Sequence, residues 1–187
     1  MHADTSTGLD HRKLVIWVFI ASETIFFAAL MATYLVYRGK TPRAEGLGLL
    51  DLNVAAINTF VLLFSSLTMV LALQSIENKN KRRMILLLLA TAFFGLVFLS
   101  GQVFEYNELL QHGVSIDTNL FGATFYTLTG FHGTHVFVGV IWITALIIRT
   151  LRGGINTQNH LAVELGGLYW HFVDLVWVVL FTIIYLI

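Results

Sequence analysis

The chain has 187 residues, of which 57% are hydrophobic and only 12% are charged, and its formal net charge at pH 7 is zero. With a mean hydropathy of +0.78, this composition is typical of a polytopic membrane protein. It leaves no room for a soluble domain, a Rossmann unit or a nucleotide-binding loop, and no nucleic-acid partner is expected. The sequence has no cysteine, which excludes disulfides, iron–sulfur ligation and thiolate metal sites.

Five apolar runs follow one another along the chain, at residues 14–37, 54–76, 84–110, 120–148 and 165–187. A helix crosses the hydrocarbon core of a bilayer in about 20 apolar residues, and each run is long enough. The sequence therefore predicts an all-α, polytopic bundle of five transmembrane helices. We expect residues 1–187 to form a single membrane domain that begins with a polar cytoplasmic tail at residues 1–12.

Lysine and arginine are distributed unequally over the two sides of this bundle. Of the 11 basic residues, three lie on the side opposite the N-terminus: Arg38, Lys40 and Arg43. The other eight lie on the side of the N-terminus: Arg12, Lys13, Lys79, Lys81, Arg82, Arg83, Arg149 and Arg152. Because basic connections stay in the cytoplasm, the N-terminus is predicted to be cytoplasmic and the C-terminus to lie outside.

Two connections carry clear signals of their conformation. Residues 38–51 hold Pro42 and three glycines, which predicts an irregular, exposed loop. Residues 77–83 form a short connection rich in basic side chains, which predicts a tight turn between two antiparallel helices.

Glu23 stands about ten residues inside the first apolar run, near the middle of the bilayer. A bare carboxylate is costly there, so the acid is expected to be neutral unless water or a cation reaches it. Two interpretations remain open from the residues alone. Glu23 is either a neutral acid that joins two helices through a hydrogen bond, or a proton-exchanging or lipid-facing site.

Further polar groups lie in the third, fourth and fifth spans. In the third, Glu108 and His112 are expected at a solvated helix end, while Glu105, one turn deeper, is expected to have a partner.

The fourth span places Thr129, His132 and His135 three residues apart, and the fifth places Glu164, His171 and Asp174 together. Histidines near a carboxylate suggest a metal site or an interhelical hydrogen-bonded network. A di-iron site would need Glu-x-x-His on paired helices, which is absent; haem ligation by His132 or His135 with His171 remains conceivable.

Three segments carry a resemblance to a known family. They are FYTLTGFHGTHVFVG at residues 125–139, ELGGLYWHFVDLVWVVLFTIIYL at residues 164–186, and SETIFF at residues 22–27. Weaker matches lie at residues 58–63 and at Gln102, Glu105 and Tyr106. In order and in extent, from the first span to the last residue, the chain resembles subunit III of haem-copper terminal oxidases in its short, five-helix bacterial form.

The resemblance implies an accessory, non-redox subunit of a proton-pumping oxygen reductase in the bacterial cytoplasmic membrane. Glu23 would correspond to the carboxyl of the family that reacts with carbodiimides. The family's subunit III holds no haem or copper, which belong to subunits I and II, so these subunits and membrane lipids are the implied partners and bound phospholipid is expected. A structural polar network would join the fourth and fifth helices, with Asp174 as its acid: Glu105, His132, His135, Glu164, His171 and Asp174.

Other functions remain open at this point. The electron donor, cytochrome c or quinol, would dock on another subunit, so subunit III of a quinol oxidase is an alternative to the favoured cytochrome c oxidase. A subunit III-like protein associated with nitric oxide reduction shares the five-helix plan. A free-standing membrane proton carrier is disfavoured, because the acids form no continuous stripe from one face to the other.

Overall fold

A computed structural model describes residues 10–38, 50–155 and 160–187 of the chain. The described residues form five long helices: α1 (His11–Arg38), α2 (Leu52–Glu77), α3 (Lys81–Gln111), α4 (Leu120–Leu151) and α5 (Leu161–Phe181). A short π-helix, η2 (Thr182–Leu186), continues α5. All five helices are long and apolar enough to cross a membrane, which confirms the all-α, five-span prediction.

Most helix ends extend beyond the apolar runs, and polar residues cap the starts of three helices. The carboxylate of Asp51 accepts hydrogen bonds from the first backbone amides of α2, and the side chains of Asn80 and Asn119 do the same for α3 and α4. Hydropathy marks only the lipid-facing stretch and misses these caps. Helix α1 begins at His11, so the last two residues of the predicted tail at residues 1–12 lie in its first turn; residues 1–9 lie outside the described residues.

The predicted tight turn is confirmed. Residues 78–80 join α2 to α3, and Lys79 adopts a left-handed backbone conformation with φ of 61°. The predicted loop at residues 38–51 falls almost entirely outside the described residues.

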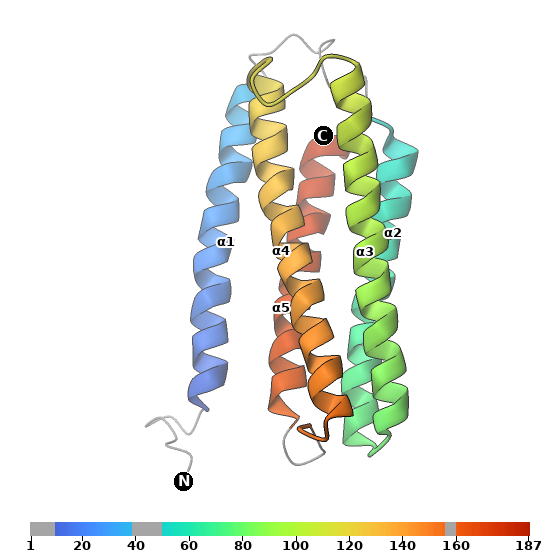
Figure 1. The fold of residues 1–187 in the computed structure, drawn as a ribbon. Coiled ribbons are helices and arrows are strands. Elements are labelled where there is room, and N and C mark those ends of the chain that lie inside the picture. The colour runs from blue at the N-terminus through green and yellow to red at the C-terminus, as the bar shows by residue number, and fades with distance from the viewer. Residues whose placement is uncertain (1–9, 39–49, 156–159) are drawn as a thin grey trace.

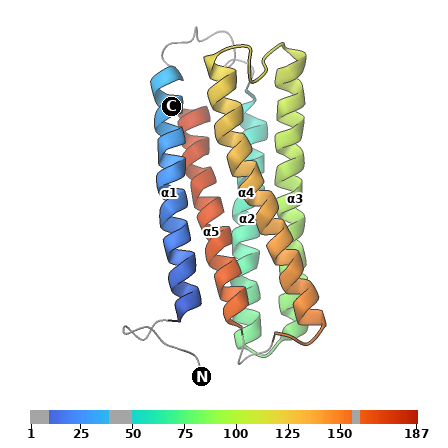
Figure 2. The ribbon, with the colours of Figure 1, turned by 60° about the vertical axis from the view of Figure 1, so that its left-hand side comes forward.

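Helix α5 is the most enclosed of the five and packs against α1, α2 and α4. Helices α2 and α3 form an antiparallel pair, and α3 also packs on α4. Helix α1 contacts α4 and α5 and lies at the edge of the bundle (Figures 1 and 2). The apolar core follows α5, with the rings of Trp170, Phe98 and Trp177 among its buried side chains.

The edge helix α1 buries few side chains. Only Ile16, Phe27 and Tyr34 are buried along its 28 residues. Val18, Ile25 and other apolar residues on its outer side are exposed, as befits a surface that meets lipid or another membrane protein. Because α1 attaches through a narrow stripe, the space that it encloses with α4 and α5 is not filled by side chains, and the candidate site lies there.

Candidate functional site

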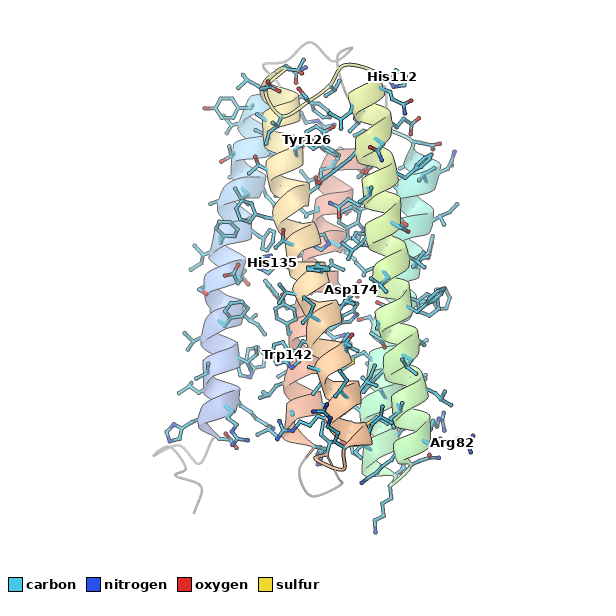
Figure 3. All side chains as sticks on the ribbon, viewed as in Figure 1. Arg82, His112, Tyr126, His135, Trp142 and Asp174 are labelled. Carbon is cyan, nitrogen blue, oxygen red and sulfur yellow. The ribbon has the colours of Figure 1, made fainter. Side chains whose placement is uncertain are left out.

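Glu23 lies near the middle of α1 and faces α4. Its Oε2 is 3.2 Å from Nε2 of His135. The two side chains keep 21% and 17% of their surface exposed, respectively, so neither is sealed inside the protein. Figure 3 shows His135 on the side of α4 that faces α1. The mid-membrane acid therefore has a base as its partner.

The second nitrogen of His135 is held by the backbone of its own helix. Nδ1 lies 2.8 Å from the carbonyl oxygen of Phe131, which can only accept a hydrogen bond. The hydroxyl of Tyr169 on α5 donates to the carbonyl oxygen of His135 at 3.0 Å. The bond of Nδ1 fixes the orientation of the ring, and the bond from Tyr169 brings α5 to the same residue. Three helices, α1, α4 and α5, therefore meet at His135.

The neighbours of Glu23 along α1 leave its carboxyl available for this contact. Ser22 and Thr24 donate their hydroxyl hydrogens to carbonyl oxygens of the preceding turn, so they do not compete for it. Phe27, one turn later, is buried and meets the ring of His135 edge-on, with centroids 5.1 Å apart. The SETIFF segment thus supplies one acid and an aromatic wall beside its partner.

A cavity of about 730 Å³ opens between α1, α4 and α5, and Glu23 and His135 line it. Its walls are otherwise mainly apolar and include Phe19, Val138 and Trp142. His11 and Arg12 line the end of the cavity where α1 begins. Eleven residues separate Arg12 from Glu23, which is about 16 Å along a helix. The cavity therefore combines a basic end, apolar walls and an acid–base pair about halfway across the membrane.

His171 contacts α2 through the hydroxyl of Ser66. Oγ of Ser66 lies 2.6 Å from Nδ1 of His171. Asp174, three residues further along α5, is buried, and its Oδ1 has no hydrogen-bond partner among the described residues. His171 is therefore joined to α2 through Ser66, and Asp174 forms no hydrogen bond with it.

His132 is fully buried and lies against two aromatic rings. Its ring stacks on Trp177 with centroids 5.0 Å apart and meets Phe98 edge-on at 5.7 Å. Both of its nitrogens are buried and have no hydrogen-bond partner among the described residues. The ring acts here as a flat packing element.

The two glutamates of the predicted network lie at opposite ends of the bundle. Glu105 accepts a hydrogen bond from the hydroxyl of Tyr185 in η2 at 2.6 Å, which provides the partner expected for it. Glu164 forms an ion pair with Lys13 of α1, also at 2.6 Å, and both side chains remain about one-third exposed. His112 is exposed, as predicted for the solvated end of α3.

The prediction of one polar network between the fourth and fifth helices is therefore wrong in its connectivity. The six residues make separate contacts, and the hydrogen bonds and ion pairs that their side chains form with other helices run to α1, α2 and η2 instead. Residues three apart on a helix differ by about 60° in direction. His135 is consequently turned well away from Thr129 and toward α1, while His132 points into the core.

The partners of these residues could not be predicted from the sequence, because hydropathy does not reveal which helices are neighbours. Ser66 could have been singled out as a hydroxyl in mid-span, but serine also serves close helix packing. Among the described residues, no three His, Asp or Glu side chains come together as a metal site would require. Fold and site thus define a multi-pass α-helical membrane protein that carries an acid–base pair at mid-membrane beside an apolar cavity.

Comparison with known proteins identifies the family. Residues 3–187 match the family of cytochrome c oxidase subunit III. Cytochrome c oxidase subunit 3 of Bacillus sp. (strain PS3) is 41% identical over 179 residues, which cover 94% of this chain and 86% of that protein. The corresponding subunit of Thermostichus vulcanus is 41% identical over 180 residues, or 95% of this chain and 88% of that protein. Quinol oxidase subunit 3 of Bacillus subtilis (strain 168) is 32% identical over 195 residues, which cover 99% of this chain and 95% of that protein. The chain belongs to the cytochrome c oxidase subunit III family.

Proposed function

We propose that the chain is the accessory, non-redox subunit III of a proton-pumping haem-copper oxygen reductase, in which it stabilises the catalytic subunit and supports proton uptake. Family membership over nearly the whole chain supports this role. The observation that carries it is the Glu23–His135 contact, an acid and a base 3.2 Å apart that open on a cavity in mid-membrane. In this proposal haem and copper lie in subunits I and II, where they supply the electron transfer, and no residue of this chain holds them.

The contribution of the chain to proton uptake rests on Glu23 as a proton-exchanging carboxyl. Ionisable groups inside a membrane are costly to keep and are commonly functional. The partly exposed carboxyl of Glu23 meets the cavity, so a proton can arrive there without crossing the packed core. We expect the chain to affect the rate of proton delivery and the resistance to inactivation during turnover, while the reduction of oxygen itself takes place in the partner subunit.

The cavity is proposed to hold a phospholipid. Its apolar walls suit an acyl chain, and Arg12 at its end suits an anionic headgroup. The span of about 16 Å between Arg12 and Glu23 matches a chain that reaches from the membrane surface to the acid–base pair.

The proposed location is the bacterial cytoplasmic membrane, with the N-terminus in the cytoplasm and the C-terminus outside. The start of α1, the α2–α3 turn and the end of α4 lie together at one end of the bundle, and Arg82 and His112 mark opposite ends in Figure 3. Most of the described basic residues lie at the end that carries Arg82, which supports a cytoplasmic placement of that end.

Cytochrome c is the favoured electron donor, and it would dock on another subunit. The identity of 41% to cytochrome c oxidase subunits, against 32% to a quinol oxidase subunit, supports this choice. Subunit III of a quinol oxidase is the second candidate because the match to that protein covers 99% of this chain.

The test is purification of the chain from its native membrane in a mild detergent, followed by identification of the chains that accompany it. We expect haem-copper oxidase subunits I and II, with the haem spectrum following those chains. The subunit separated from them should show neither haem nor copper. Stoichiometric haem in the separated subunit, or a preparation that lacks a haem-copper catalytic chain, would contradict the proposal.

A further inference from the structure

The two nitrogens of His135 differ in the protons that they can carry. Nδ1 lies 2.8 Å from the carbonyl oxygen of Phe131. A carbonyl oxygen only accepts, so Nδ1 must carry a hydrogen for this bond to exist. In the neutral imidazole, Nε2 is then the unprotonated nitrogen and can only accept.

Nε2 lies 3.2 Å from Oε2 of Glu23. Two atoms that both lack a proton would face each other with their lone pairs, so the contact is favourable only with one proton between them. That proton belongs either to the carboxyl, which then donates to Nε2, or to Nε2, which then donates to the carboxylate. Both arrangements leave the pair without net charge, which a site inside the membrane favours.

We propose that Glu23 and His135 form one proton-sharing unit, in which His135 is the positioning residue that controls release of the proton from Glu23. The step is a transfer within the pair: carboxyl and neutral imidazole become carboxylate and imidazolium, with no other reactant. This inference rests on the proposed function, because it specifies the partner of the proton-exchanging acid.

The surroundings of the pair direct its exchange toward the cavity. The edge of Phe27 lies against the imidazole ring, and Phe26 and Phe131 close the adjacent contact between α1 and α4 with centroids 5.1 Å apart. Both members of the pair line the cavity. A proton therefore enters and leaves on the cavity side.

Few other titratable groups face the pair. On α5, Tyr169 lines the cavity and donates to the backbone of His135. On α4, His132 is one turn away but enclosed by rings. The remaining titratable groups that line the cavity, His11 and Arg12, lie at its far end, where Lys13 is paired with Glu164. Within the described residues, His135 is thus the base that meets the carboxyl of Glu23 directly.

The test is carbodiimide labelling of Glu23 in the assembled complex over a series of pH values, read out by peptide mass spectrometry. A carbodiimide reacts with the protonated carboxyl, so labelling declines as Glu23 loses its proton. In His135→Gln the carboxylate has no imidazolium to stabilise it, and the acid should keep its proton to higher pH. We expect the half-maximal pH of labelling to rise by about one unit or more, a tenfold change in the proton equilibrium.

His171→Gln is the matched control, because His171 is also half-buried in mid-membrane but contacts Ser66. Its labelling profile should equal that of the unaltered complex. Labelling of Glu23 with the same pH profile in the His135→Gln complex would overturn this inference and leave the proposed function standing. Absence of Glu23 labelling from the unaltered complex would contradict both.

A second measurement does not depend on carbodiimide labelling. Nitrogen-15 NMR of histidine-labelled complex should show Nδ1 of His135 protonated throughout, with the resonance assigned by its loss in His135→Gln. A neutral ring that carries its hydrogen on Nε2 instead would overturn the inference.

Discussion

The indole ring of Trp170 on α5 lies directly against Gly139 of α4. A β-carbon at Gly139 would stand 2.7 Å from Cζ3 of the ring, and one at Gly95 of α3 would stand 2.7 Å from Cη2. The nitrogen of the same ring donates a hydrogen bond to Oγ of Ser65 on α2 at 2.9 Å. One side chain therefore fixes the separation of four helices, and two glycines make the room for it.

Gly139→Ala should destabilise the bundle. The added methyl group would collide with the indole ring of Trp170, which its contact with Gly95 and its hydrogen bond to Ser65 hold in place. Such overpacking typically costs about 1–3 kcal/mol. We expect a lower midpoint of thermal unfolding in detergent and weaker retention of the subunit in the complex. Combining the change with Trp170→Phe, which shortens the ring system, should recover part of the loss.

Gly130→Ala is the control on the same helix. A β-carbon there would meet only the hydroxyl of Tyr106, at 3.8 Å, which is an ordinary contact. Its unfolding midpoint should match that of the unaltered protein. Equal stability of the two alanine variants would refute the close fit of Trp170.

Ser66→Ala should weaken the attachment of α5 to α2. The change removes the hydroxyl that is bonded to Nδ1 of His171 and leaves this half-buried nitrogen without that partner. An unsatisfied buried group costs about 1–3 kcal/mol. The midpoint of thermal unfolding and the retention of the subunit should both decline, and His171→Leu, which leaves the hydroxyl of Ser66 without the imidazole, should act in the same direction.

Ser100→Ala provides the comparison for Ser66→Ala. Ser100 also lies in a transmembrane helix, but its side chain is exposed and donates to the carbonyl of Val97 in its own helix. Removing that hydroxyl should leave stability and retention unchanged. A Ser66→Ala variant that behaves like Ser100→Ala would show that the bond between Ser66 and His171 adds nothing.

The ion pair between Lys13 and Glu164 should matter little by itself. Its 2.6 Å distance is short, but both side chains are about one-third exposed at the end of the bundle, where water and salt screen the charges. Exposed pairs contribute about 0.2–1 kcal/mol. A double-mutant cycle with Lys13→Ala and Glu164→Gln should give a coupling energy in that range, which falls as salt is added. A coupling well above it would mean that the pair is shielded in the assembled complex.

Much of the fold is readable from the sequence, because the existence of each helix depends on its own residues. The apolar runs locate all five spans, and the short basic connection at residues 77–83 predicts the turn. Lateral neighbours depend instead on side chains from distant segments. Gly139 could be recognised as a site of close approach, but nothing near it in sequence identifies Trp170 as the ring that fills the space.

The candidate site was likewise predictable only in part. The depth of Glu23 follows from counting residues along one helix, so its importance could be predicted. Its partner could not, because the direction in which His135 points depends on how α1 docks against α4. The assumption that neighbouring motifs in the sequence form one network placed His135 with α5, whereas its ring turns toward α1.

Filling the cavity should remove bound phospholipid. Val138→Trp would place a bulky ring on the wall of the cavity between α1 and α4, where an acyl chain is proposed to lie. We expect the purified complex to retain less tightly bound phospholipid, measured by native mass spectrometry and by phosphorus content. Val18→Trp adds the same ring on the exposed outer side of α1 and should retain the usual amount. Equal lipid content in both variants would contradict a lipid site in this cavity.

His132→Phe should leave the bundle as stable as before or make it more stable by up to about 2 kcal/mol. Both ring nitrogens of His132 are buried without a partner among the described residues, so their desolvation opposes folding. A phenyl ring keeps the contacts with Phe98 and Trp177 and removes the polar atoms. His132→Ala, by contrast, opens a cavity among these rings and should cost about 3 kcal/mol or more. The two unfolding midpoints, measured in the same detergent, separate the contribution of shape from that of polarity. A strong loss of stability in His132→Phe would contradict a purely packing role for this ring.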